Sequence, residues 1–113
     1  MSYDIYRACI EACNRCVTEC ENCASECIEE DANNMAECIH LDLDCSLICS
    51  MAAKLMARGS DAVQDICQVC AEACRRCAAE CRMHDEEHCQ RCADACDACV
   101  AECEKVAREP APV

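Results

Sequence analysis

The spacing of the cysteines is the feature that most constrains how this chain can fold. There are 19 cysteines in 113 residues, and in three blocks they are separated alternately by three and four positions. The blocks are Cys9, Cys13, Cys16, Cys20, Cys23 and Cys27; Cys67, Cys70, Cys74, Cys77 and Cys81; and Cys89, Cys92, Cys96, Cys99 and Cys103. This alternating step keeps side chains on one face of an α-helix, whereas a strand would need steps of two. The pattern predicts helices that turn rows of thiols toward one another.

A fourth, sparser block fits the same scheme. It contains Cys38, Cys45 and Cys49, and we expect its inward line to be filled by Leu41, Ile48, Ala52, Leu55 and Met56. Four similar blocks indicate a repeated helical unit. The 19 alanines favour helix, and a single glycine with two prolines argues against a turn-rich β fold. We therefore predict an all-α fold, an antiparallel four-helix bundle with a cysteine-lined core.

Capping signals set the expected boundaries. Asn34 with Glu37 resembles a capping box, Gly59 suits the left-handed position after a helix, and Ser60 and Asp85 are expected N-caps. The prediction is one domain over residues 1–109, with helices at about 3–29, 34–58, 60–82 and 86–108, and a frayed tail over 110–113.

Charge excludes several classes of partner. Ten basic and 23 acidic residues give a net charge of −13, which opposes binding to nucleic acid and to anionic membranes. There is no Trp or Phe for base stacking, no run of about 20 apolar residues for a membrane span, and no basic leader before Arg7. We therefore expect a soluble, cytoplasmic protein whose cysteines are reduced thiols or metal ligands.

Metal binding explains the thiols better than two structural interpretations. Nineteen thiols used only as small apolar side chains would pack loosely. Disulfides are disfavoured by the odd count and by the poor geometry of cysteines three or four apart on one helix. The metal interpretation is favoured by six CxxC pairs on facing seams, namely Cys13/Cys16, Cys20/Cys23, Cys67/Cys70, Cys74/Cys77, Cys89/Cys92 and Cys96/Cys99.

Charge balance favours Cu(I) as the metal. Each Cu(I) that displaces one thiol proton leaves the charge of the core unchanged, and soft thiolates suit this ion. Zinc in Cys₄ sites would leave two negative charges per site, which are costly to bury. Three alternatives stay open: a thiol/disulfide redox-buffering protein, a zinc protein and an iron–sulfur protein.

At this point the chain resembles a known family. The CxxxCxxCxxxCxxCxxxC pattern from Cys9 to Cys27 and the CxxCxxxCxxCxxxC patterns of the third and fourth blocks resemble the cytosolic copper storage proteins. The resemblance implies storage of many Cu(I) ions by the cysteines of a four-helix bundle, a homotetramer, a cytoplasmic location and no enzymatic turnover. A copper chaperone is then a candidate delivering partner.

Softer ligands gather near one expected end of the bundle. Met35, Met83, His84 and His88 fall near the two turns at that end, and by helical phase both histidines continue the inward line of the 60–82 helix. We predict that copper enters there, the alternative being that these are ordinary turn residues. The opposite end is expected to be an apolar plug of Leu55, Met56, Val63, Ile66 and Val106.

A second apolar stripe runs along the 34–58 helix. It consists of Leu43, Leu47 and Met51 at steps of four, and Ile10 and Val17 lie one position beyond cysteines of the first helix. These residues either pack between neighbouring helices or form a contact between subunits. His40 lies off the inward line and is expected at the surface.

Overall fold

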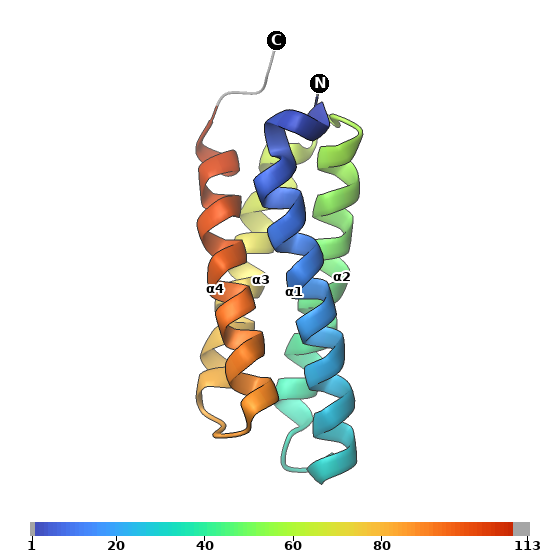
Figure 1. Ribbon diagram of the computed structural model, residues 1–113, viewed down its shortest axis with the longest axis vertical. Coiled ribbons are helices and arrows are strands. Elements are labelled where there is room, and N and C mark those ends of the chain that lie inside the picture. Colours follow the sequence, from blue (N-terminus) through green and yellow to red (C-terminus); the bar gives the residue numbers. More distant parts are fainter. Residues whose placement is uncertain (1, 110–113) are drawn as a thin grey trace.

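Four helices account for most of the chain in the computed structural model, which describes residues 2–109, with Ser2 described by its backbone alone (Figure 1). They are α1 (Ser2–Asp31), α2 (Ala36–Ala57), α3 (Val63–Arg82) and α4 (Glu87–Arg108). The expected helices are thus observed; the C-terminal ends of the third and fourth agree with the prediction, and the other ends differ by one to three residues. The tail predicted over 110–113 lies outside the described residues.

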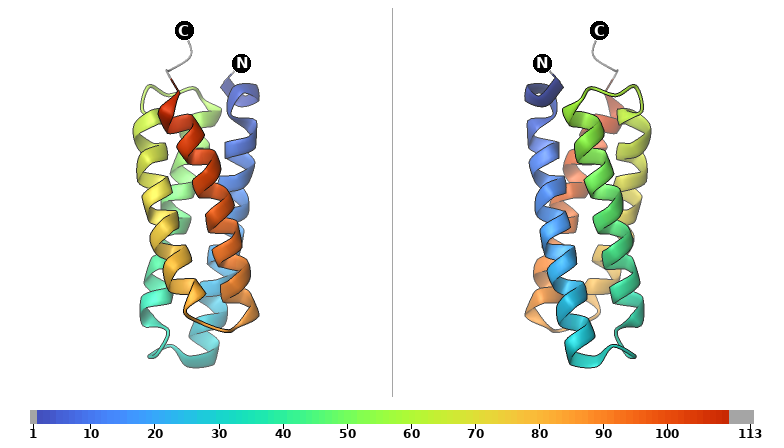
Figure 2. Two further views of the ribbon diagram at one scale, coloured as in Figure 1. Left: turned by 90° about the vertical axis from the view of Figure 1, so that its left-hand side faces the viewer. Right: turned by 90° about the vertical axis from the view of Figure 1, so that its right-hand side faces the viewer.

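The helices form an antiparallel bundle, as the cysteine pattern predicts. Each helix packs against two neighbours, α1 and α3 each lying between α2 and α4, so that four seams meet along one axis. The bundle measures 48 × 19 × 18 Å, and the two side views show near-parallel axes with connections only at the ends (Figure 2). This arrangement makes the central axis the place where every inward side chain converges.

The connection between α2 and α3 depends on Gly59. Its φ of 67° lies in the left-handed region, which glycine occupies without steric cost. The Gly59 N–H donates to the carbonyl of Met56 and the Ser60 N–H to that of Leu55, at 3.2 and 3.0 Å. This pair of bonds is a Schellman motif, and the expectation for the chain's single glycine is confirmed.

The expected N-caps are wrong. Met35, not Asn34, precedes α2, and no side chain caps that helix. The reason is that the Asn34 amide donates to the carboxylate of Asp31 at 2.7 Å, which organises the turn instead. The capping box with Glu37 is therefore absent.

The two other capping residues lie outside their helices. Ser60 accepts the N–H of Ala62 through its Oγ at 3.1 Å, so it stabilises the turn while α3 begins three residues later than predicted. Glu86, and not Asp85, is the residue immediately before α4, and no side-chain hydrogen bond caps this helix either.

All 19 cysteines face the bundle axis. Every one is buried, Cys9 being 2% exposed and the rest 0%. Small alanines flank them, among them Ala24, Ala71 and Ala93. The core between the helices is therefore made largely of sulfur. This column of thiols is the candidate functional site.

Candidate metal centre

The thiols of different helices are in contact along the whole bundle. All 19 are free. Contacts between helices include Cys9 with Cys103 at 3.6 Å, Cys49 with Cys70 at 3.4 Å, and Cys38 with Cys81 at 3.7 Å, each measured between Sγ atoms. The helical 3/4 step places these sulfurs, because successive seam residues of one helix meet successive seam residues of its neighbours.

The thiols fall into groups of four that share members. One group is Cys13, Cys70, Cys99 and Cys103; the next is Cys16, Cys49, Cys74 and Cys99; the next is Cys16, Cys20, Cys45 and Cys96; and the next is Cys20, Cys77, Cys92 and Cys96. Within each group the sulfurs lie within 4.8 Å of one another. Cys16, Cys20, Cys96 and Cys99 each belong to two of these groups. These four groups therefore form one chain of adjoining sites.

The sulfur spacing suits ions held between thiolates. With metal–sulfur bonds of about 2.3 Å, two sulfurs on one ion lie about 4.0 Å apart in trigonal and about 4.6 Å apart in linear coordination. Cys16 already has four sulfur neighbours at 3.6 to 4.0 Å, on Cys20, Cys45, Cys74 and Cys96. These distances are close to the sulfur–sulfur spacing expected around one trigonal ion.

Sequence reasoning missed a buried carboxyl group on α2. Asp42 is completely buried, with Oδ1 at 3.1 Å from the Cys77 Sγ, 3.3 Å from the Cys92 Sγ and 3.6 Å from the Cys81 Sγ. Leu41, which was expected on the inward line, is only half-buried, as are Ile48 and Leu55. The signal was available, because position 42 lies four after Cys38 and three before Cys45 and so continues the seam.

Burial keeps Asp42 protonated. Desolvation, reinforced by the neighbouring Cys92 and Cys77, raises the pKa of its carboxyl group to about 11. Burial likewise raises the pKa of the Cys89 thiol to about 12 and that of the Cys27 thiol still further. At neutral pH the carboxyl group of Asp42 and the thiols of Cys27 and Cys89 are therefore uncharged.

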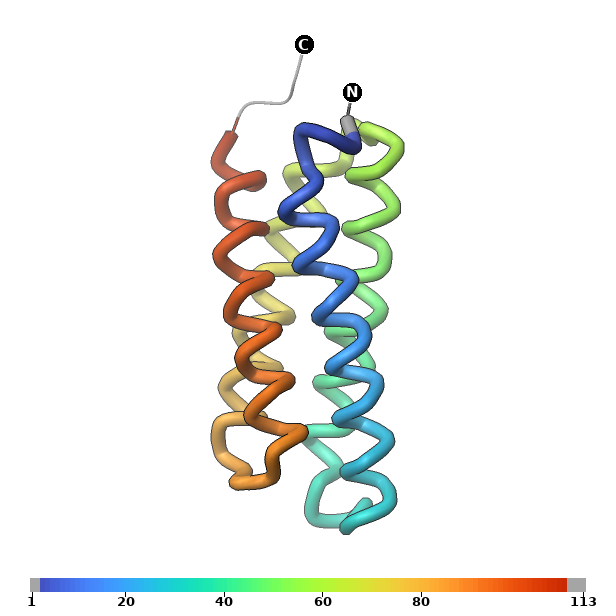
Figure 3. The backbone as a smooth tube through the Cα atoms, viewed as in Figure 1, coloured from blue at the N-terminus to red at the C-terminus, as the bar shows by residue number. Residues whose placement is uncertain are grey.

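A fifth group of thiols lies at one end of the column and carries a histidine. It consists of Cys23, Cys27, Cys38 and Cys89. His88, only 8% exposed, places its Nδ1 3.4 Å from the Sγ of Cys23 and 3.6 Å from that of Cys89. Its Nε2 lies 2.8 Å from Oε1 of Glu30. We call this end the mouth; both the α1–α2 and the α3–α4 connections lie there, as Figure 3 shows.

The three other predicted mouth residues lie at different depths. Met35 is buried at the start of α2, whereas the Met83 side chain is 75% exposed and points to solvent. His84 is partly buried and pairs through Nε2 with Glu80 at 2.8 Å. The inward line of α3 does not continue through both histidines, because α3 ends at Arg82 and His88 belongs to the first turn of α4.

The opposite end of the column is closed by apolar side chains. Met56 and Val63 are fully buried there, Val106 is 8% exposed, and Leu55 and Ile66 pack against them. Tyr6 adds a further buried side chain at this end. The predicted apolar plug is confirmed, and the column has no polar side chain at this end comparable to His88 among the described residues.

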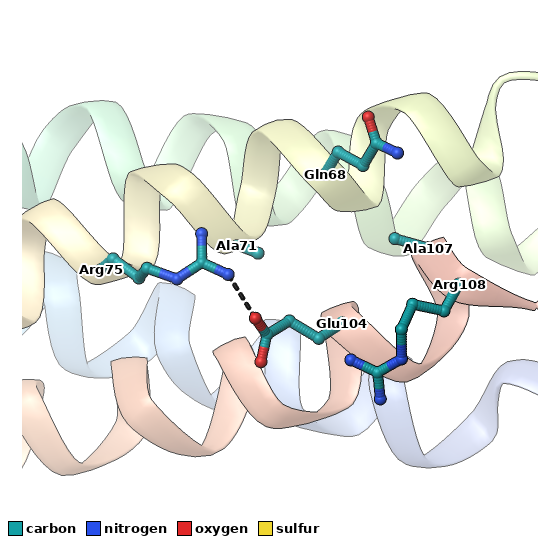
Figure 4. A pocket seen from close by; sticks show the side chains of 6 residues that line it. All are labelled: Gln68, Ala71, Arg75, Glu104, Ala107 and Arg108. Carbon is teal, nitrogen blue, oxygen red and sulfur yellow. Dashed lines mark hydrogen bonds and ion pairs between the residues drawn. The ribbon is translucent and has the colours of Figure 1, made fainter.

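Pockets on the outer surface offer no competing site. One of about 300 Å³ lies between α3 and α4, where Arg75 pairs with Glu104 across the opening (Figure 4). Two others lie between neighbouring helices, and none of the three is lined by a cysteine. Among residues 2–109 no helix has the length and apolar character needed to cross a bilayer.

A four-helix bundle filled by a connected column of thiols defines a class of metal-binding protein. A family model described as copper storage protein matches residues 2–108, and the chain belongs to this family. The cysteine-rich protein YhjQ of Bacillus subtilis (strain 168), itself described as uncharacterized, is 43% identical over 82 residues, which are 72% of this chain and 76% of the relative.

Solved structures of copper storage proteins share the fold over nearly the whole chain. Cu(I)-bound BsCsp3 is similar with a TM-score of 0.87 and 40% identity, covering 95% of this chain and 99% of that one. A cytosolic copper storage protein from Streptomyces lividans, solved during loading with five coppers, gives a TM-score of 0.90 at 34% identity, covering 96% and 97% of the two chains.

The burial of Asp42 predicts a pH-dependent stability of the metal-free protein. The pKa of this carboxyl group rises from 3.8 to about 11 on folding, so between these values the folded state binds one more proton than the unfolded state. The free energy of unfolding therefore falls as pH rises, by up to about 1.4 kcal/mol per pH unit from this group. Asp42→Asn should remove that contribution and raise stability at pH 7.

Anaerobic urea unfolding at pH 6 and pH 8 measures the effect. The wild-type protein should lose up to about 2.7 kcal/mol more than Asp42→Asn over this interval. Asp44→Asn, a change at an exposed position of the same helix, serves as the matched control and should keep the wild-type slope. Parallel pH profiles for the wild type and Asp42→Asn would contradict a neutral buried carboxyl group.

Proposed function

We propose that this protein stores Cu(I), with its 19 cysteines as bridging and terminal thiolate ligands along the bundle axis. The observation that carries the proposal is the chain of four-thiol groups with shared members. Membership of the copper storage protein family supports it. We further propose that residues 1–109 act as a single copper-binding unit, and that its role is sequestration rather than catalysis.

The sharing of thiols favours a univalent ion over zinc. Separate tetrahedral zinc sites need four thiolates each, whereas these groups share Cys16 and Cys99. Bridging thiolates can hold Cu(I) on both sides while each ion replaces one proton. Because each ion replaces one proton, the net charge of the core does not change as it fills.

Copper enters at the mouth in this proposal. His88 contacts the Cys23 and Cys89 thiols with one ring nitrogen and lies at the rim, where Glu30 is 44% exposed. His84 is partly buried and Met35 is buried at the same end, and Met83 presents an exposed thioether. Imidazole and thioether bind Cu(I) less tightly than thiolate, so they can pass ions inward.

The outer face of α2 is the proposed contact between subunits. Leu43, Leu47 and Met51 are 44%, 66% and 45% exposed and form the expected stripe. Ile10, by contrast, is buried within the bundle and so belongs to ordinary packing. Exposed large apolar side chains in a row favour association, and we propose a homotetramer. The similarity to a cytosolic protein of Streptomyces lividans supports a cytoplasmic location, where a copper chaperone would deliver the ion.

Anaerobic titration with Cu(I) against a competing chelator tests the storage function. Uptake should approach one ion per thiol, about 19 per chain, while the helical circular dichroism stays constant because the bundle is already folded. Cys16→Ser should lower the capacity more than Cys67→Ser, since Cys16 belongs to two of the adjoining four-thiol groups. Saturation near one ion per four thiols would instead indicate zinc-type sites. A visible charge-transfer spectrum in the isolated protein would indicate an iron–sulfur cluster, and thiols that cycle to disulfides would indicate redox buffering.

Combined replacement of Met83, His84 and His88 by Ala tests the mouth. The initial rate of Cu(I) uptake should fall by at least about tenfold, because the softer ligands that pass ions inward are gone. The final capacity should be unchanged, since the thiols remain. His40→Ala removes an exposed histidine of α2 and provides the control. Stopped-flow absorbance of the thiolate–copper band gives the rates, and equal rates in all three proteins would refute this route.

Leu43→Glu tests the subunit contact. A carboxylate within the apolar stripe should disfavour burial of that face, so sedimentation should show smaller particles than the wild type. Ile28→Glu makes the same change at an exposed apolar residue of α1 and should leave the mass unaltered. An unaltered mass for Leu43→Glu would place the contact elsewhere.

A further inference from the structure

Four polar side chains, two from α1 and two from α4, are in contact at the mouth. Oε1 of Glu30 lies 2.8 Å from Nε2 of His88, and on the other side of the ring Nδ1 lies 3.4 Å from the Cys23 Sγ and 3.6 Å from the Cys89 Sγ. The two ring nitrogens therefore meet different partners. One faces a carboxylate at the rim and the other faces the outermost thiols of the column.

The chemistry of the partners fixes the proton on the ring. A carboxylate oxygen only accepts hydrogen bonds, so Nε2 is the nitrogen that donates. A neutral imidazole carries a single N–H, which leaves Nδ1 with its lone pair. The thiols of Cys23 and Cys89 can donate to that lone pair in the metal-free protein, and a Cu(I) ion can take the place of their protons.

The position of Glu30 is unfavourable for its own helix. The last turn of α1 contains Glu29, Glu30 and Asp31 and no basic residue. Negative charge at a helix C-terminus opposes the helix dipole. Residues that are unfavourable for the helix that contains them often serve a function. The contact with His88 supplies such a function for Glu30.

We propose that Glu30 is a positioning residue: by accepting the Nε2–H of His88, it holds the Nδ1 lone pair toward the Cys23 and Cys89 thiols as the first acceptor of Cu(I). This inference rests on the proposed function, in which copper enters at the mouth. A carboxylate that orients a histidine in this way raises the basicity of the ligand and fixes the ring. Without it, the ring is free to turn and present either nitrogen.

Nuclear magnetic resonance of the metal-free, reduced protein with ¹⁵N-labelled histidine tests the orientation. The wild type should show a slowly exchanging Nε2–H signal for His88, because the proton is held by a carboxylate at a ring that is 9% exposed. Glu30→Ala should lose this signal to solvent exchange. Glu30→Gln should keep it, since the side-chain carbonyl still accepts. The signal should also persist in Glu29→Ala, which removes a neighbouring exposed carboxylate.

Stopped-flow loading supplies the second measurement. The initial rate of Cu(I) uptake should fall about tenfold in Glu30→Ala, in line with losses of outer-shell partners, and stay near wild type in Glu30→Gln and Glu29→Ala. The capacity should be unchanged in all variants. If Glu30→Ala retains the protected Nε2–H and loads at the wild-type rate, the proposal is overturned. An equal slowing by Glu29→Ala would also overturn it, because charge alone would then suffice.

The two proposals fail in different ways. The ¹⁵N signal is measured without copper, so it reports the Glu30–His88 contact even if the protein stores no copper. Absence of Cu(I) uptake by the wild type would refute storage. Normal uptake with no effect of Glu30→Ala would refute the positioning role alone.

Discussion

The contact between thiols of facing helices is the constraint on which the rest of this structure depends. Because cysteine is small, helices that meet through cysteine and alanine approach closely, and the column of sulfur at the axis is continuous. Such a core buries little apolar area for its length. The stability of the metal-free bundle must therefore come to a large extent from helix-favouring alanines and from the larger side chains at its closed end, Met56, Val63 and Tyr6.

Much of the fold followed from spacing alone, and the misses have physical causes. The 3/4 step predicted the helices, their inward faces and the burial of every cysteine, because residues at this spacing all lie on the same face of an α-helix. Asp42 was missed because a carboxylate is normally an outward residue, although its position continues the α2 seam. The N-cap predictions were wrong because short polar side chains can form hydrogen bonds within a turn as easily as with a helix end, as the Asn34–Asp31 pair shows.

The two carboxyl groups that contact the column, Asp42 in the core and Glu30 at the mouth, lie in different electrostatic environments. Inside, burial keeps the Asp42 carboxyl group protonated, so that this group adds no charge to the core. At the rim, the Glu30 side chain is 44% exposed to water, while His88 links it to the thiols. Sequence could place the histidine near this end. It could not show the contact with Glu30, which is 58 residues away in the chain and comes close only through the packing of α1 against α4.

The apolar plug has a consequence for the order in which ions exchange. A column with one polar mouth and one sealed end resembles a stack, in which the last ion to arrive is the first able to leave. Ions bound near Cys23 and Cys89 would exchange quickly when the copper supply changes. Those held near Cys13 and Cys103, beside the plug, would respond only after the outer ones had gone. One chain of a single fold would then contain both a rapid buffer and a slow reserve.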